Sequence, residues 1–301
     1  MPNKPILGFI GLGLMGKPMA AHLLKAGFPL WVHNRSQAAV DELVALGATA
    51  AGSPAELAAA VDIVFTCLPD SPDVEQVVLG PDGIAGGAGP GLIVVDHSTI
   101  KPATARHLAA ALAERGLGWL DAPVSGGQLG AEQGTLTVMV GGEADALERA
   151  RPALEAFSKA ITHIGAAGAG QVAKCCNQIM VAAQMTALAE LLIFARKADV
   201  DPAKVVQAIR GGAAACWTLD NKPERLFAGN RQPGFKAYMQ AKDMGIVMDS
   251  AAEFGMPLPA SEVATQLYDQ MLEMGLGDLD NSALVGVLEK MAGVQLLADS
   301  D

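Results

Sequence analysis

Residues 7–19 read Leu-Gly-Phe-Ile-Gly-Leu-Gly-Leu-Met-Gly-Lys-Pro-Met, an apolar run followed at once by a glycine-rich turn with the spacing Gly-x-Gly-x-x-Gly. In a strand-turn-helix unit the first glycine of this pattern permits a tight turn, and the second lets a pyrophosphate approach the backbone. The third lets helix and strand pack closely, and the helix start directs N–H groups at the phosphates. We therefore predict dinucleotide binding here. The expected contact residues are Gly11, Leu12, Gly13, Leu14, Met15 and Gly16.

Apolar runs typical of buried strands alternate with amphipathic segments through the first half of the chain. The expected strands are 6–10, 30–33, 63–68, 92–96, 119–121 and 135–140. The expected helices are 17–26, 37–46, 74–78, 102–115 and 147–157, with a further helix start at Ser53-Pro54. Strands that alternate with helices of about ten residues indicate βαβ units and a mainly parallel sheet.

The pattern changes after Gly165. Residues 165–170 form a glycine-rich junction, and residues 171–198 contain neither Pro nor Gly, which favours one long helix. Asp201-Pro202 has the residue types of a helix N-cap and first turn, and no strand is expected after Ile164. We predict an α/β Rossmann domain over residues 1–164, followed by an all-α domain over 165–301, the two being joined by the long helix.

The end of the second expected strand indicates which dinucleotide is preferred. An acidic residue at this place commonly holds the ribose 2′-hydroxyl of NAD. This chain has His33-Asn-Arg-Ser36 instead. Asn34 is neutral, Arg35 can pair with a 2′-phosphate, and Ser36 can donate a hydrogen bond to it. These residues favour NADP(H), with NAD(H) as the alternative.

The charge balance argues against a polyanionic partner. The 301 residues include 21 Lys and Arg against 32 Asp and Glu, which gives a net charge of −11 with His neutral. A protein that binds nucleic acid or an anionic membrane needs clustered positive charge on its own surface, so neither is expected as a partner. The histidines and cysteines show no metal-ligand spacing, so no metal site is expected.

The chain also lacks the usual signs of export or membrane insertion. A spanning helix needs about 20 mostly apolar residues. The best candidate, 179–194, is interrupted by Gln184 and Glu190. The first residues have no basic region followed by an apolar stretch and a cleavage site. We therefore expect a cytoplasmic protein with no membrane partner.

Five further blocks accompany the opening turn. They are Ala122-Pro-Val-Ser-Gly-Gly127, Gly134-Thr-Leu-Thr-Val-Met-Val-Gly-Gly142, Gly170-Gln-Val-Ala-Lys-Cys-Cys-Asn-Gln178, Pro233-Gly-Phe-Lys236 and Ala241-Lys-Asp243. In this order and spacing they resemble the β-hydroxyacid dehydrogenase family, which includes 3-hydroxyisobutyrate dehydrogenase, over nearly the whole chain. The resemblance implies a Rossmann domain followed by a helical domain, and a homodimer or homotetramer.

The resemblance also implies roles for individual residues. Lys174 matches the catalytic lysine, and Asn177 matches a residue that helps to hold substrate. Ser125, Gly126 and Gly127 match the segment that binds the substrate carboxylate. Lys242 matches a lysine near the cofactor, and Leu68, Pro69 and Thr99 match loops that touch the cofactor.

Elementary chemistry supports these roles. Lys174 and Asn177 are three residues apart, so they share one face of a helix. Hydride addition to an aldehyde builds negative charge on its oxygen, and a lysine ammonium can stabilise that charge and deliver the proton. We therefore predict an NAD(P)H-dependent reductase that interconverts a small carboxylated aldehyde and its hydroxy acid. A non-catalytic dinucleotide-binding protein is the alternative of a different class, and it would not need this set of residues.

Other runs bear on the substrate. The segments Ala208-Ile-Arg-Gly-Gly212, Thr218-Leu-Asp220, Gly229-Asn-Arg-Gln-Pro-Gly-Phe235 and Asp280-Asn-Ser-Ala-Leu284 are similar to the branch that converts tartronate semialdehyde to glycerate. Dehydrogenases of 3-hydroxyisobutyrate or 4-hydroxybutyrate type stay open. Trp217 is bulky where small residues are expected. It would alter the accepted substrate if it faced a cleft and change nothing if it packed between helices.

Overall fold

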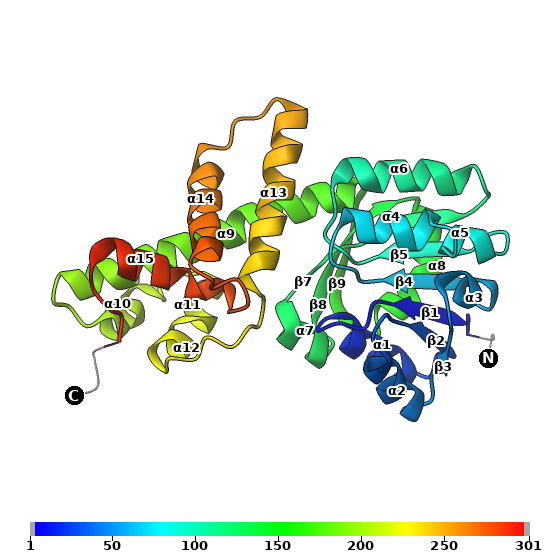
Figure 1. Ribbon diagram of the computed structural model, residues 1–301, viewed down its shortest axis with the longest axis horizontal. Helices are drawn as coiled ribbons and strands as arrows, with labels where there is room; N and C mark the ends of the chain where they lie inside the picture. Colours follow the sequence, from blue (N-terminus) through cyan, green and yellow to red (C-terminus); the bar gives the residue numbers. More distant parts are fainter. Residues whose placement is uncertain (1–3, 298–301) are drawn as a thin grey trace. The chain divides into compact units, whose positions relative to one another are not determined.

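The computed structural model describes residues 4–297 and divides into two compact units (Figure 1). The first unit runs through Lys174 and the second begins at Cys175. The helix α9, Ala169–Lys197, therefore belongs to the first unit only by its first turns, which pack on the sheet. The domain boundary expected between residues 164 and 165 stays a prediction.

The first unit is built on one mixed sheet with the strand order β3-β2-β1-β4-β5-β6-β8-β7, in which β9 also pairs with β8. The strands from β3 to β6 in this order are parallel, whereas β8 is antiparallel to β6 and β7 and parallel to β9. The order reverses between β1 and β4, and such a switch point is where ligands bind in open α/β sheets. The strands are β1 Leu7–Ile10, β2 Leu30–His33, β3 Thr49–Ala50, β4 Ile63–Thr66, β5 Ile93–Asp96, β6 Gly118–Asp121, β7 Val124–Ser125, β8 Leu136–Gly142 and β9 Ser158–Gly165.

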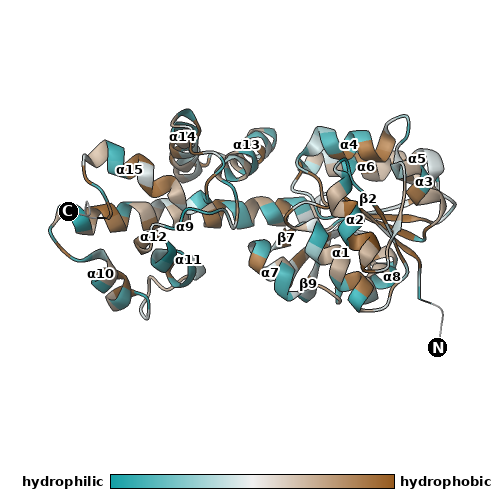
Figure 2. Ribbon diagram, turned by 60° about the horizontal axis from the view of Figure 1, so that its bottom comes forward, coloured by the Kyte–Doolittle hydropathy of each residue, from teal (hydrophilic) through white to brown (hydrophobic). Residues whose placement is uncertain are grey.

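Helices cover both faces of this sheet (Figures 1 and 2). Within β4, Ile63 and Phe65 join the core under α1, α2 and α8, while Val64 joins the core under α3, α4 and α6. This alternation explains why the strands read as continuous apolar runs. The helices are α1 Gly16–Lys25, α2 Gln37–Ala45, α3 Pro54–Ala59, α4 Ser71–Leu79, α5 Ile84–Gly87, α6 Pro102–Ala113, α7 Gly127–Gln133 and α8 Ala144–Leu154.

The second unit is helical. Its core is formed by buried side chains of α9, α13, α14, η1 and α15, such as Leu192, Met244 and Tyr268. Its further elements are α10 Pro202–Ile209, α11 Trp217–Asn221, α12 Pro223–Phe227, α13 Ala237–Phe254, α14 Pro259–Glu273, the 3₁₀ helix η1 Asn281–Leu284 and α15 Val285–Ala292. As the sequence predicts, Asp201 caps α10 by accepting a hydrogen bond from the Ala203 N–H, and Pro202 occupies the first turn.

The predicted fold class, an α/β Rossmann unit followed by a long helix and a helical unit, is confirmed. The helix α9 is long and apolar enough to cross a membrane by length and composition alone. Its side chains Met185, Leu188 and Leu192 are nevertheless buried in the helical core. A soluble core helix has the same composition, so the expected lack of a membrane partner stays a prediction.

The sequence prediction missed five elements of the first unit: β3, β7, β9, α5 and α7. The strand β9 lies at the side of the sheet beyond β8, and most of its residues are only partly buried or exposed. It therefore lacks the continuous apolar run that marks the central strands. The other four elements are too short to carry a periodic pattern.

Candidate active site

The glycine turn after β1 has the geometry that its spacing predicts. Gly11 has φ +96°, a conformation that favours glycine, and a Cβ there would lie 2.3 Å from the Cys67 carbonyl oxygen. A Cβ on Gly16 would lie 1.9 Å from the Gly11 carbonyl oxygen. These two glycines are therefore required by the protein's own packing, one against the end of β4 and the other between helix and turn.

Gly13 differs from its two neighbours in the motif. A Cβ built on it would have no atom of the protein within 4 Å. Open space at this glycine leaves room for a group that is not protein, beside a helix that has no acidic residue in its first turn. A pyrophosphate fits such a place because the backbone N–H groups and the helix dipole both favour an anion.

Asn34 holds the turn in shape. Its side-chain oxygen accepts a hydrogen bond from the Leu12 N–H at 3.1 Å, and its side-chain nitrogen donates to the Ser36 carbonyl oxygen at 3.1 Å. Arg35 beside it is 85% exposed, with a guanidinium nitrogen 3.8 Å from the Asp73 carboxylate. Such a long, exposed ion pair restrains Arg35 little, so the guanidinium can reorient toward a ligand.

A buried hydrogen-bond network joins the ends of β4 and β5. Thr66 and Ser98 both donate their hydroxyl protons to Oδ1 of Asp96, at 2.7 and 2.6 Å. The Ser98 hydroxyl also accepts a hydrogen bond from the Leu68 N–H at 2.8 Å. Burial raises the pKa of Asp96 to about 6, although these hydrogen bonds oppose the shift. The network therefore fixes the start of the Leu68-Pro69 loop next to Ser98, the residue before Thr99.

The next carboxylate in the sheet, Asp121 at the end of β6, is hydrogen-bonded to the start of α9. Its two oxygens accept hydrogen bonds from the Gly168 N–H at 2.7 Å and the Gln171 N–H at 2.9 Å. Burial raises its pKa even though these N–H groups favour the ionised form. The approach is close, since a Cβ on Gly170 would lie 2.4 Å from the Asp121 carbonyl oxygen. The sheet therefore fixes the first turn of α9.

Lys174 lies on the next turn of α9 and is buried. Its ammonium group donates a hydrogen bond to the Val124 carbonyl oxygen at 2.8 Å. The structure thus brings Lys174 next to the segment Ser125-Gly126-Gly127. Within this segment Ser125 ends β7 and Gly127 begins α7. Gly126 and Gly127 have φ +133° and +63°, values that glycine adopts readily.

In the second unit a chain of side-chain contacts links Asn177 to Lys242. Asn177 donates to the Gln178 side-chain oxygen at 2.7 Å, and Gln178 donates to Oδ2 of Asp243 at 2.7 Å. The Lys242 ammonium lies 2.9 Å from Oδ1 of Asp243, whose side chain is 1% exposed. Gln178 and Asp243 were not predicted as site residues. Asn177 and Lys242 lie 65 residues apart, so only the fold brings them into one network.

Histidine chemistry is not supported at the strand ends. His97 follows Asp96, but its ring lies against Phe65 and Phe157, and its Nδ1 bonds to the Ala122 carbonyl oxygen at 2.7 Å. Burial lowers its pKa to about 4, so the ring is neutral at physiological pH. His97 is therefore a packing residue. Within residues 4–297, no group of three or more His, Cys, Asp or Glu side chains is placed to hold a metal ion.

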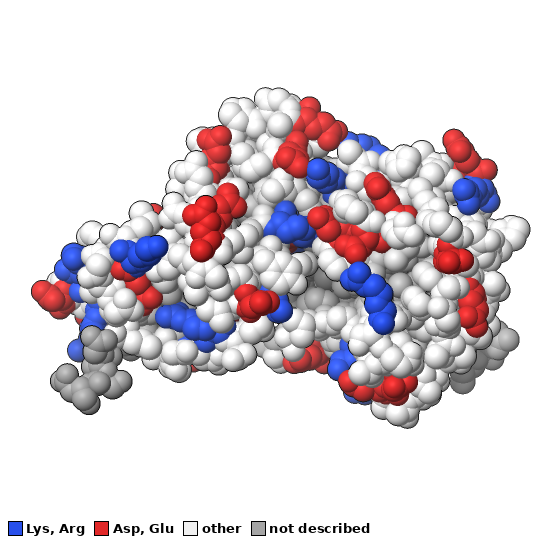
Figure 3. All heavy atoms as spheres, viewed as in Figure 1, with Lys and Arg blue, Asp and Glu red and all other residues white. Residues whose placement is uncertain are grey.

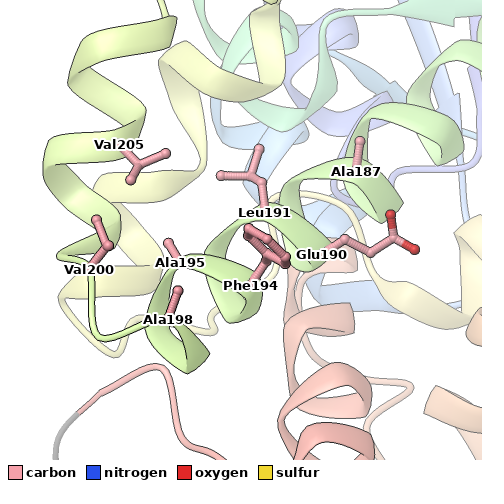
Figure 4. Close-up of a pocket in the computed structure, with 8 residues that line it drawn as sticks. All are labelled: Ala187, Glu190, Leu191, Phe194, Ala195, Ala198, Val200 and Val205. Carbon is pink, nitrogen blue, oxygen red and sulfur yellow. The ribbon is translucent and has the colours of Figure 1, made fainter.

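The surface of the described residues carries mixed charge and an apolar pocket. On the face shown in Figure 3, acidic and basic side chains of the described residues are interspersed. An apolar pocket of about 480 Å³ lies between the later turns of α9 and the start of α10 (Figure 4). Phe194, Leu191 and Val205 line it, and no predicted site residue does.

A strand order that reverses at a glycine turn is the arrangement that binds dinucleotides in open α/β sheets, and here a buried lysine lies near the strand ends. Residues 6–165 match the family model described as the NAD binding domain of 6-phosphogluconate dehydrogenase. Residues 168–288 match the model described as NAD-binding of NADP-dependent 3-hydroxyisobutyrate dehydrogenase. The chain belongs to the 3-hydroxyisobutyrate dehydrogenase family, and the predicted resemblance is thereby confirmed.

Individual relatives agree. The chain is 41% identical to 2-hydroxy-3-oxopropionate reductase of Escherichia coli, over 96% of this chain and 99% of that one. It is 41% identical to NAD-dependent L-serine dehydrogenase of Pseudomonas aeruginosa, over 95% and 99%. A structure of Mycobacterium tuberculosis 3-hydroxyisobutyrate dehydrogenase with L-serine has 35% identity and a TM-score of 0.87, over 94% and 99%. The protein is an oxidoreductase that acts on the CH–OH group of a hydroxy acid.

The three glycines of the turn predict separable effects. Gly13→Ala meets no protein atom, so its melting temperature is expected to stay within about 2 °C of the wild type. Its affinity for the dinucleotide is expected to fall about tenfold or more, because the methyl group occupies the space left for phosphate. Gly16→Ala collides with the turn itself and is expected to lose both stability and binding. Thermal melts and cofactor titrations check this, and equal loss of stability in both variants would contradict it.

Proposed function

We propose that the protein reduces tartronate semialdehyde to glycerate, and catalyses the reverse oxidation, with Lys174 as the proton donor. The single observation that carries this proposal is the buried Lys174, held on the Val124 carbonyl beside Ser125-Gly126-Gly127. The substrate assignment is supported by the four runs of the second half that are similar to the tartronate semialdehyde branch. The 41% identity to 2-hydroxy-3-oxopropionate reductase supports the same choice.

In this proposal each residue has a separate role in the reaction. Backbone N–H groups at Ser125, Gly126 and Gly127 bind the substrate carboxylate, since consecutive N–H groups in a glycine turn can form an anion nest. Asn177, one turn beyond Lys174 on α9, hydrogen-bonds the substrate. The nicotinamide, when bound, supplies the hydride that adds to the carbonyl carbon. Lys174 donates its proton to the carbonyl oxygen, so the aldehyde becomes an alcohol, and the same amine takes that proton back in the oxidation.

The cofactor is proposed to be NADP(H) and to lie on the residues that the sequence indicates. Leu12, Gly13, Leu14 and Met15 face the pyrophosphate, and Leu68, Pro69 and Thr99 contact the rest of the dinucleotide. Lys242 is proposed to lie near the cofactor. Arg35 binds the 2′-phosphate, because its guanidinium is exposed and only weakly paired. One family model is described as NADP-dependent, whereas one relative is named NAD-dependent, so NAD(H) is the alternative.

The substrate alternatives are 3-hydroxyisobutyrate and 4-hydroxybutyrate, and L-serine joins them because a relative is named for it. Trp217 bears on this choice. Trp217 is 56% exposed, and the Lys222 ammonium lies over its ring at 5.9 Å from the ring centroid, so Trp217 does not fill a gap between helices of its unit. We therefore propose that Trp217 influences which substrates are accepted.

We further propose a cytoplasmic homo-oligomer, a dimer or tetramer. The exposed face of α9 carries apolar side chains at helical spacing, including Met180, which is 58% exposed, and Phe194, which is 77% exposed. Apolar stripes of this kind are typical of surfaces that another protein covers. Light scattering of the purified protein tests the proposal, and a monomer at micromolar concentration would contradict it.

Replacement of the lysine tests the mechanism. Lys174→Met keeps the apolar stem but removes the proton donor, so kcat is expected to fall about 100-fold or more. Cofactor affinity is expected to change less than about threefold, because the glycine turn is untouched. The measurement is a kinetic panel of tartronate semialdehyde, methylmalonate semialdehyde, succinic semialdehyde and L-serine with both cofactors.

Lys204→Ala, an exposed lysine on α10, is the matched control and is expected to behave as the wild type. Near-normal turnover of Lys174→Met would remove the lysine from the mechanism. A clear preference of the wild type for another substrate of the panel would overturn the assignment to tartronate semialdehyde.

Cofactor selection is tested at Arg35. Arg35→Ala is expected to lower kcat/KM for NADPH about tenfold or more, because a charge-assisted hydrogen bond to the 2′-phosphate is lost. The value for NADH is expected to change less than about threefold. Arg115→Ala, an arginine elsewhere in the same unit, serves as the control. Equal losses for both cofactors would contradict the 2′-phosphate role.

A further inference from the structure

We infer that Gln171 is a positioning residue that fixes the main chain around Thr99 relative to Lys174. Gln171 lies on the first turn of α9 and its side chain is completely buried. Its side-chain nitrogen donates to the Ser98 carbonyl oxygen at 2.8 Å. Its side-chain oxygen accepts a hydrogen bond from the Ile100 N–H at 3.2 Å.

The two hydrogen bonds enclose one residue. The Ser98 carbonyl and the Ile100 N–H are the main-chain groups on either side of Thr99, and in a parallel sheet they would pair with the N–H and C=O groups of one residue of a neighbouring strand. The Gln171 amide presents the same donor and acceptor, so it takes the place of that residue's main chain. The Thr99 segment is thereby fixed in position without belonging to the sheet.

The main chain of Gln171 is also fixed in place. The main-chain N–H of Gln171 is bound to the Asp121 carboxylate at 2.9 Å, so the residue cannot shift along the helix axis. Lys174 follows three residues later on the same helix face. One rigid turn of helix therefore connects the Thr99 segment to the proposed proton donor. The Ser98 hydroxyl in turn accepts a hydrogen bond from the Leu68 N–H, so the restraint extends to the loop after β4.

This inference rests on the proposed function, in which Thr99 contacts the cofactor and Lys174 protonates the substrate. Hydride and proton must reach two adjacent atoms of one substrate, so the segment that touches the cofactor and the lysine must keep a fixed separation. A displacement of about 1 Å between reacting groups can reduce a rate about 100-fold. Gln171 is never in contact with the reacting atoms in this scheme and acts through its two neighbours.

Gln171→Glu distinguishes a positioning role from a purely structural one, because its effect on kcat is expected to depend on pH. The introduced carboxyl has nearly the same shape, but only its protonated form can donate to the Ser98 carbonyl. The ratio of the variant's kcat to that of the wild type is therefore expected to be about 0.1 or less at pH 8. It should rise toward 1 as the pH falls and the carboxyl takes up a proton. Burial favours that uptake.

Gln171→Met removes both hydrogen bonds at every pH. Its kcat ratio is expected to be low and independent of pH, while NADPH affinity changes less than about threefold because the glycine turn is intact. Ser250→Ala removes a buried hydrogen bond to the Ile246 carbonyl in the other unit. It is the control for loss of stability alone and is expected to keep its kcat. If the methionine variant does not fold, Gln171→Asn, whose amide is too short to reach, replaces it.

Hydrogen exchange of the Ile100 amide in the same variants needs no substrate. Exchange is expected to be at least tenfold faster in Gln171→Met than in the wild type and unchanged in Ser250→Ala. A wild type that reduces no aldehyde would refute the proposed function, while the exchange rate would still decide the role of Gln171. Unchanged exchange, or a kcat ratio of Gln171→Glu that does not vary with pH, would overturn the inference.

Discussion

The buried carboxylate of Asp121 is the interaction on which the rest of the structure depends. It ends β6 and accepts hydrogen bonds from the N–H groups of Gly168 and Gln171, so it joins the sheet to the first turn of α9. A helix begins with N–H groups that have no partner within the helix, and burying them unpaired would be costly. Asp121 therefore does more than stabilise the helix start. It sets the axial position of α9, and with it the place of Lys174 beside the Val124 carbonyl.

Local hydrogen-bond donors reconcile the negative net charge of the chain with the negative charge of its ligands. The chain carries a net charge of −11, yet its cofactor and its hydroxy-acid substrates are anions. Binding must then depend on a few local donors. We propose that these donors are the N–H groups of the glycine turn around Gly13 and the side chains of Arg35 and Lys174. Both buried carboxylates of the strand ends, Asp96 and Asp121, already accept hydrogen bonds from hydroxyl or N–H groups, so they serve the scaffold rather than oppose the ligand.

The sequence predicts those parts of the molecule that depend on local pattern. The glycine spacing predicted the turn, and the alternation of apolar runs with helices predicted the parallel sheet, because each needs only neighbouring residues. The edge strand β9 was missed because its residues are partly buried or exposed and form no continuous apolar run. The links from Asp121 to Gln171, and from Gln178 to Asp243, span 50 and 65 residues. No local pattern reveals such pairs, since only the folded chain brings them together.

A crystal structure of the wild-type protein with NADPH and a non-reducible analogue of the hydroxy acid tests the central claim most directly. The account predicts that the pyrophosphate lies against the backbone N–H groups at Gly13. It also predicts that the Lys174 nitrogen lies within about 3.2 Å of the ligand's hydroxyl oxygen, the distance that proton transfer requires. A ligand oxygen out of reach of Lys174, or a dinucleotide bound away from Gly13, would contradict it.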